Sequence, residues 1–306
     1  MNLSFKTIGR FVLTRVFLIY ILGMVAVYQV MDVRGALDRA KAQTLNRLIP
    51  QDVGKILLLS REPDAVSSQD LRSIIYYFKK AQQYRSDANG ADGIIAYCYY
   101  YLGDISKAIE HYKKDLNENP QYFWSHFNLA LIYFQQGDVQ EAVDHLQICL
   151  LLQPDVSLNM MSSWKTYQQV LGNQRDNVPL IGGSMTEAYD DAYQILLAGY
   201  ERSNDFERME ATAQKALELH FDGKDVFYYY TGLGAFKRKD FARAGYFLQK
   251  AVEENMAMAP AYYYLGQCAL IAGNANLSKE LTIRSEQLGG RDQLPFDRQR
   301  LAVRLL

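Results

Sequence analysis

A repeat of 34 residues in the middle of the chain limits how it can fold more than any other feature. The stretch 97–120 reads YCYYYLGDISKAIEHYKKDLNENP, and the stretch 132–154 reads IYFQQGDVQEAVDHLQICLLLQP. The residues that recur at this spacing are Gly103 and Gly137, Asp104 and Asp138, Ala108 and Ala142, His111 and His145, and Pro120 and Pro154. Such a period is typical of chains built from stacked helical units rather than from one globular core.

Each unit of the repeat is predicted to form two antiparallel helices. The Gly-Asp pair makes the turn between them, because glycine tolerates left-handed dihedral angles. The alanine lets the second helix pack closely, and the proline ends the unit because it cannot continue a helix. The same frame places Asn204–Asp205, Lys239–Asp240 and Gly273–Asn274 in later turns. The pattern therefore predicts an all-α solenoid of helix-turn-helix repeats.

These residues resemble the tetratricopeptide-repeat (TPR) family over about residues 55–288. The resemblance is strongest at 89–122, 123–156 and 259–288, where the turn, the alanine and Leu265–Gly266 occupy family positions. It implies an α-solenoid that binds proteins, and it identifies no specific member. The predicted organisation is an N-terminal membrane anchor at 1–35, a linker and capping segment at 36–68, an N-terminal TPR block at 69–156, a degenerate repeat and loop at 157–186, a C-terminal TPR block at 187–288, and a C-terminal tail or capping helix at 289–306.

The unit at 157–186 departs from the pattern. Residues 157–172 suit a first helix, but 172–185 contain Pro179 and Gly182, which favour a loop. Long loops inside a compact array are commonly functional or act as hinges. Two interpretations stay open: a decayed repeat bridged by an ordered loop, and a loop that contacts a partner.

The N-terminal segment is predicted to cross a lipid bilayer. Residues 16–31 carry no charged side chain, and extending the run back to Phe11 adds only Arg15. A spanning helix needs about 20 mostly apolar residues, and an arginine near its end can reach the headgroups. We therefore expect residues 11–31 to be an uncleaved anchor. A cleaved signal or targeting peptide is the alternative, although Val33–Arg34–Gly35 is a poor cleavage site.

Charges beside this run suggest its orientation. Lys6, Arg10 and Arg15 precede it and favour a cytoplasmic N-terminus, whereas basic residues after it weaken that preference. The predicted location is a bacterial inner membrane, spanned once, with the solenoid in the periplasm. The whole chain has a net charge of -1, and the part after the anchor is mildly acidic. This balance argues against a nucleic-acid partner.

Motifs for chemistry are not recognisable in the sequence. Gly232-Leu233-Gly234 lacks the third glycine of a dinucleotide fingerprint and falls in a predicted helix, where small residues allow close packing. His111 and His145 share one repeat position, so the period explains their likeness. Asp190–Asp191 is interpreted as a solvated helix face. The three cysteines fit no zinc spacing and are predicted to be buried: Cys98, Cys149 and Cys268. We predict no catalytic, cofactor-binding or metal-binding residue and no enzyme activity.

A partner-binding groove is implied by the TPR resemblance, because the first helix of each unit lines it in this family. The residues predicted to contact a partner are Tyr97, Tyr100, Trp124, Phe127, Leu131, Phe134, Tyr229, Phe236 and Tyr263. They would make the groove aromatic, which suits a peptide or a helix. The lysine and asparagine pattern with which some members hold a chaperone's C-terminal carboxylate is missing. The alternative is that many of these aromatics belong to the core or are covered by the chain's own termini.

The predicted function is a non-enzymatic, membrane-anchored scaffold that mediates protein–protein interaction or assembly of a membrane or envelope complex. A permanent structural accessory subunit of such a complex is the alternative, and a regulator of an enzyme is a remote one. The C-terminal residues 295–306 mix arginines with apolar residues. They are predicted to form a helix that caps the last repeat, or one that lies on a membrane surface or a partner.

Overall fold

The computed structural model describes residues 66–84, 91–152, 185–219, 221, 223–297 and 301–303. Within these ranges the chain forms α-helices joined by turns, and no described residue belongs to a β-strand. The helices are α2 (Ser68–Tyr84), α3 (Ala91–Tyr101), α4 (Ile105–Glu118), α5 (Phe123–Gln136), α6 (Val139–Leu151), α8 (Met185–Arg202), α9 (Phe206–Glu218), α10 (Lys224–Lys237), α11 (Phe241–Glu254), α12 (Ala259–Ile271) and α13 (Ala275–Gln287).

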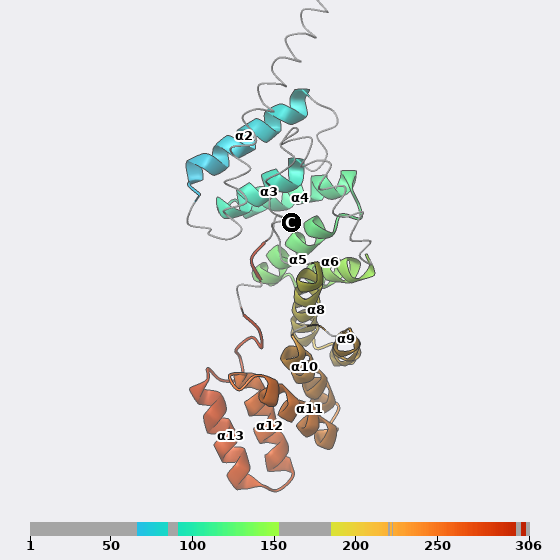
Figure 1. Ribbon diagram of the computed structural model, residues 1–306, viewed down its shortest axis with the longest axis vertical. Helices are drawn as coiled ribbons and strands as arrows, with labels where there is room; N and C mark the ends of the chain where they lie inside the picture. The colour runs from blue at the N-terminus through green and yellow to red at the C-terminus, as the bar shows by residue number, and fades with distance from the viewer. Residues whose placement is uncertain are drawn as a thin grey trace, which may run out of the picture.

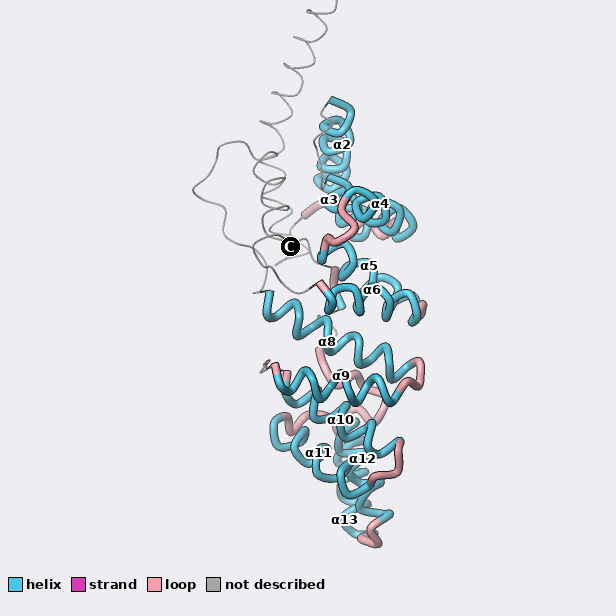
Figure 2. Tube along the Cα trace, turned by 90° about the vertical axis from the view of Figure 1, so that its right-hand side faces the viewer, coloured by secondary structure: helices cyan, strands magenta, loops and turns pink. Residues whose placement is uncertain are grey.

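The helices stack in sequence order into an elongated array, with α2 at one end and α13 at the other (Figure 1). The pairs α3–α4, α5–α6, α8–α9, α10–α11 and α12–α13 pack internally, and each pair also contacts its neighbour. Figure 2 shows the same order after a quarter turn. The prediction of an all-α solenoid of helix-turn-helix repeats is confirmed for the described residues.

The turn inside each pair has one conformation throughout. Its first residue has a positive φ in every case: Gly103 79°, Gly137 90°, Asn204 58°, Lys239 67° and Gly273 83°. The N–H of the next residue donates to the carbonyl five positions earlier, as Asp104 does to Tyr99 at 2.9 Å. This is the hydrogen-bond pattern of a Schellman helix end. The predicted turns are confirmed, although two of them hold a non-glycine residue in a conformation that costs about 1–2 kcal/mol.

The acidic or amide residue after each turn starts the next helix. The side chains of Asp104, Asp205, Asp240 and Asn274 each accept a hydrogen bond from the backbone N–H three residues later. Asp138 makes no such bond. A cap of this kind is worth about 1 kcal/mol. The two turn residues therefore set both the end of one helix and the start of the next.

Glycines inside α10 allow its neighbours to approach closely. A Cβ added to Gly232 would lie 2.8 Å from Cγ of Leu248 on α11, and one added to Gly234 would lie 2.7 Å from Cβ of Glu210 on α9. Carbon atoms normally pack at about 3.5–4.0 Å. The Gly-Leu-Gly sequence is thus a helix-packing feature, as predicted.

A continuous aromatic core runs through the array. Its largest fully buried side chains are Tyr97, Tyr112, Tyr229, Tyr230, Phe78, Phe123, Phe127, Phe134 and Phe227. Burying a large apolar side chain contributes about 1.5–3 kcal/mol relative to leaving it exposed. The three cysteines are free and buried in this core, as predicted.

The prediction of a solvated face for Asp190 and Asp191 is wrong. Their exposed fractions are 4% and 0%, and Asp190 accepts a hydrogen bond from Gln194 Nε2 at 2.9 Å. The reason is that α8 packs against both α6 and α9, so both of its sides are covered. Two adjacent carboxylates do not reveal this kind of burial in a sequence.

The described residues after α13 differ from a capping helix. Residues 289–297 and 301–303 form turns, bends and irregular chain rather than an α-helix. Gly289 and Gly290 have φ values of 116° and 81°, which are incompatible with continuing α13. The helix expected over 295–306 is therefore replaced by an irregular tail where the structure describes it.

Among the described helices, none combines the length and apolar character needed to cross a bilayer. The predicted span at 11–31 lies outside the described residues, and so does the degenerate repeat predicted at 157–186 except for residues 185–186, which begin α8.

Candidate partner-binding surface

The predicted contact residues of α3 form one end of the candidate surface. Tyr97 is fully buried, whereas Tyr100 and its neighbour Tyr101 are partly exposed. The Tyr101 ring lies 4.8 Å from that of Tyr97 and 5.2 Å from that of Tyr100. The hydroxyl of Tyr100 donates to Oε1 of Gln135 on α5 at 3.1 Å. We call Tyr100, Tyr101 and Gln135 the N-terminal aromatic patch.

The four predicted residues of α5 lie in the core. Their exposed fractions are 6% for Trp124, 0% for Phe127, 0% for Leu131 and 1% for Phe134. Arg202 of α8 covers Phe134: its guanidinium carbon lies 3.8 Å from the ring centre, and Nη1 donates to the Phe134 carbonyl at 3.1 Å. Direct contact of these four side chains with a partner stays a prediction, and it would require the array to open here.

The predicted residues of α10 and α12 come together at the other end. Tyr229 is buried, while Phe236, Tyr263 and the adjacent Tyr264 are partly exposed. The Tyr264 ring lies 5.3 Å from Phe236, 5.1 Å from Tyr263 and 6.4 Å from Tyr229. Phe236, Tyr263 and Tyr264 form what we call the C-terminal aromatic patch.

Two cations border the C-terminal aromatic patch. Lys237 Nζ lies 5.9 Å from the centre of the Tyr264 ring, and the Arg291 guanidinium lies 5.7 Å from that of Tyr263. These are cation–π distances. The patch therefore combines aromatic faces with positive charge, a combination that suits apolar and acidic side chains of a protein partner.

A partly buried carboxyl, that of Glu201, lies near the same patch. Burial raises the pKa of Glu201, and the nearby Tyr230, Lys237 and Tyr229 oppose that shift only in part. Both tyrosines are buried on α10. Glu201 of α8 therefore lies close to these two tyrosines and to Tyr264 of the patch.

Some residues of both patches were missed from the sequence. Tyr264 had a signal, since 262–264 is a run of three tyrosines and only Tyr263 was assigned to the surface. Tyr101 likewise ends a run of aromatic residues on α3. Gln135 and Arg291 carried no pattern, because a single polar residue near a helix end has many possible roles.

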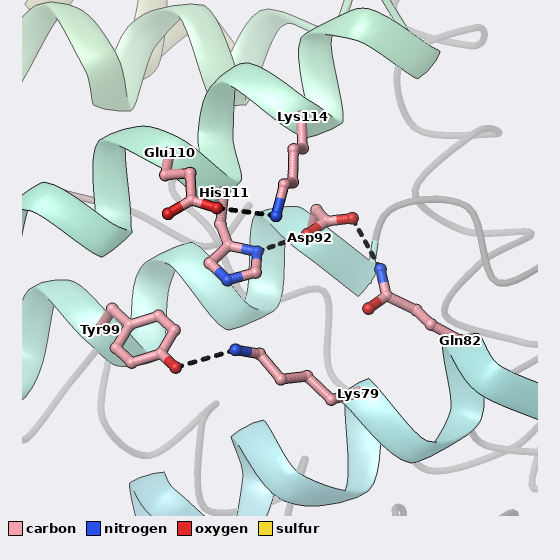
Figure 3. A network of polar contacts seen from close by, with 7 residues as sticks. All are labelled: Lys79, Gln82, Asp92, Tyr99, Glu110, His111 and Lys114. Atoms are coloured by element: carbon pink, nitrogen blue, oxygen red, sulfur yellow. Dashed lines mark hydrogen bonds and ion pairs between the residues drawn. The ribbon is translucent and has the colours of Figure 1, made fainter.

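A polar network joins α2 to α3 and α4 (Figure 3). Asp92 is buried, accepts a hydrogen bond from Gln82 Nε2 at 2.6 Å and contacts His111 Nδ1 at 2.5 Å. Lys79 Nζ of α2 donates to the Tyr99 hydroxyl at 3.0 Å. Burial alone would raise the pKa of Asp92, but the hydrogen bonds from His111 and Gln82 outweigh it and lower the pKa. This His–Asp pair therefore connects helices and stabilises the start of the array.

The described ranges contain no candidate metal site, because no three His, Cys, Asp or Glu side chains are grouped there in a way that could hold an ion. The histidines at the shared repeat position make different contacts. His111 meets Asp92, whereas His145 meets His126 at 2.8 Å between their Nδ1 atoms. The period thus explains their positions but not their partners.

Comparisons with known proteins find a repeat match in part of the chain and a shared fold. A family model described as TPR repeat matches residues 96–147, which span α3 to α6. No curated protein matches the chain. Its structure is similar to YrrB, described as a TPR protein with an unusual peptide-binding site, with a TM-score of 0.50, 14% identity and coverage of 71% of this chain and 95% of YrrB.

Two further solved structures are similar. One is a MamA protein, with a TM-score of 0.49, 17% identity and coverage of 67% of this chain and 93% of that one. The other is pilF of Pseudomonas aeruginosa, with a TM-score of 0.49, 11% identity and coverage of 83% and 96%. At such identities structural likeness shows only the fold. Residues 96–147 therefore match the TPR repeat, the same turn recurs in every described helical pair, and the described part of the chain shares its fold with the TPR protein YrrB.

Proposed function

We propose that this protein is a non-enzymatic, membrane-anchored scaffold that holds a protein partner on the first helices of its repeats. TPR modules generally mediate protein–protein interaction, and YrrB is described as having a peptide-binding site. The observation that carries the proposal is the C-terminal aromatic patch. Three partly exposed aromatic side chains meet there between two cations.

The chemistry of the patch suits a peptide or a helix that presents apolar and acidic side chains. Aromatic residues and arginine are the commonest energetic centres of protein interfaces. Tyrosine buries a large area at a low cost in conformational entropy, and arginine adds charge and several hydrogen-bond donors. The fully buried Tyr229, whose ring lies 6.4 Å from that of Tyr264, forms the layer beneath, so little ordering is needed on binding.

Anchoring is the part of the proposal that rests on the sequence. The apolar run at 11–31 is long enough to span a bilayer, and the basic residues before it favour a cytoplasmic N-terminus. The repeats would then lie in the periplasm at a bacterial inner membrane, within reach of membrane or envelope complexes. Removing residues 1–35 is expected to release the protein into the soluble fraction after ultracentrifugation, and continued pelleting with membranes would contradict a sole N-terminal anchor.

Partner binding is expected to fall about tenfold or more when Tyr263 is replaced by alanine, because an exposed aromatic at an interface centre commonly contributes over 1 kcal/mol. The measurement is purification of the full-length chain in detergent, identification of the co-purifying protein and titration of that protein against each variant. Tyr246→Ala is the matched control, since Tyr246 is 61% exposed and lies on α11, which is the second helix of its repeat and so outside the proposed surface. Equal binding by the two variants would contradict the proposed surface.

A further inference from the structure

The chain's own C-terminal segment lies on the N-terminal aromatic patch. The Tyr101 hydroxyl donates to the Val303 carbonyl at 3.3 Å, and Gln135 Nε2 donates to the Leu301 carbonyl at 2.6 Å. Val303 is 2% exposed, Leu301 is partly buried, and Ala302 between them is exposed. In Figure 1 this short red piece lies beside α3 and α5, far along the array from α13, the helix that it follows in the chain.

The contacts define what the patch can recognise. Two backbone carbonyls, two residues apart, accept hydrogen bonds from side chains of the patch. Because every residue type has a backbone carbonyl, these bonds do not select a side chain. Selectivity comes from Val303, whose side chain enters the core, and from the partly buried Leu301. The recognised pattern is therefore a segment with apolar side chains at two alternate positions and an unconstrained residue between them.

The patch is organised by contacts that do not involve the tail. Gln135 Nε2 also donates to the Tyr100 hydroxyl at 3.0 Å, and that hydroxyl donates to Gln135 Oε1 at 3.1 Å. Tyr100 thereby orients the amide that reaches the tail. Gln135 is exposed and Tyr101 is partly exposed, so water can satisfy both groups when the segment leaves. When residues 301–303 leave, the side chains of Gln135 and Tyr101 are therefore not left buried without a hydrogen-bond partner. The segment can then be replaced by another one.

We propose that residues 301–303 are an internal ligand of the N-terminal aromatic patch, and that a partner segment with the same alternate apolar pattern binds there only when this ligand leaves. The proposal rests on the scaffold function given above and adds a regulation to it. Because the ligand is part of the chain, its effective concentration is of the order of millimolar. A partner in solution must compete with it, so the observed affinity falls with the fraction of time that the patch is free.

The test uses full-length protein in detergent and a fluorescein-labelled synthetic peptide with the sequence of residues 295–306. Val303→Asp places a charge at a buried apolar position and should expel the segment. Ala302→Asp is the matched control, because it adds the same charge at the exposed position next to it. Fluorescence anisotropy is expected to show peptide binding roughly tenfold tighter to Val303→Asp than to wild type or Ala302→Asp. Adding Gln135→Leu to Val303→Asp should abolish this binding.

Equal binding by wild type and both tail variants, or binding by none of them, would overturn the proposal. A second measurement guards against a poorly folded Val303→Asp variant: Gln135→Leu alone should speed tryptic cleavage in the tail, read by mass spectrometry, and an unchanged cleavage rate would count against an internal ligand. A wild-type dimer that becomes monomeric with Val303→Asp would mean that the tail binds a second copy instead. The Tyr263→Ala experiment concerns the other patch, so failure here leaves the scaffold proposal standing.

Discussion

Replacing Phe127 with alanine is expected to lower the free energy of unfolding by about 3–5 kcal/mol. The Phe127 side chain is 0% exposed. Its ring lies 5.7 Å from that of Phe123 and 6.0 Å from that of Trp124, and Phe123 in turn lies 5.0 Å from Tyr189 of α8. Truncation would leave a cavity in this aromatic cluster that the packed helices can close only in part.

Urea unfolding followed by circular dichroism would measure this loss. The matched control is Tyr76→Ala, since Tyr76 is 56% exposed on α2 and such surface changes usually stay within about 0.5 kcal/mol. The experiment also decides between two roles that the sequence left open. If Phe127→Ala kept its stability and lost partner binding instead, Phe127 would belong to the partner surface and the core described here would be wrong.

The turns were predictable because they follow from the period and from backbone geometry. Asn204 and Lys239 take the same left-handed conformation as Gly137, with φ values of 58°, 67° and 90°. Residue type alone would not place Lys239 there, but its spacing from the other turns does. Fold class in a repeat protein is therefore well determined by local sequence, because each unit repeats one solution.

Which aromatic residues stay exposed was much harder to predict. Repeat position places Phe127 and Tyr263 alike on a first helix, yet Phe127 is fully buried and Tyr263 is partly exposed. The two side chains differ in exposure because different parts of the array pack around them. Phe127 packs in the cluster that reaches α8, whereas Tyr263 lies on α12, close to the end of the array. Exposure thus depends on neighbouring units, and the period does not encode it.

Long-range contacts had no signal in the sequence at all. The Tyr101–Val303 hydrogen bond joins residues 202 positions apart, and the repeat frame covers neither the tail nor its destination. A helix was expected over 295–306 from its mixture of arginines and apolar residues. Gly289 and Gly290 instead end the helical path, and the described tail can then reach α3 and α5. In the described tail, the contacts of residues 301–303 with α3 and α5 take the place of the expected helix.

Acidification tests a second buried contact, the pair His126–His145. Their Nδ1 atoms are 2.8 Å apart, and His126 Nε2 lies 2.9 Å from the Pro120 carbonyl oxygen. A carbonyl can only accept a hydrogen bond, so His126 Nε2 must donate. In the neutral pair, therefore, His126 Nδ1 accepts and His145 Nδ1 donates. Protonating both rings would set two N–H groups and two positive charges against each other.

Both rings lose basicity on folding. Burial lowers the pKa of His126, and it lowers the pKa of His145 from 6.5 to about 4, helped by the charges of His126 and Lys113 and opposed by Asp144. A histidine with a lowered pKa binds fewer protons when folded than when unfolded. Its contribution to stability is fully present above the unfolded pKa of 6.5 and is lost as pH falls toward 4.

Between pH 7 and pH 4, the wild-type protein is therefore expected to lose about 2–3 kcal/mol more of its free energy of unfolding than His145→Gln loses, at 1.36 kcal/mol per pKa unit. Glutamine keeps a donor for His126 Nδ1 and cannot be protonated. Burial raises the pKa of Asp115 to about 6, which adds stability on acidification, but this acts on both proteins and cancels in the difference. Urea titrations at several pH values would measure it. Parallel losses in the two proteins would show that the pair is already protonated, or already open, at neutral pH.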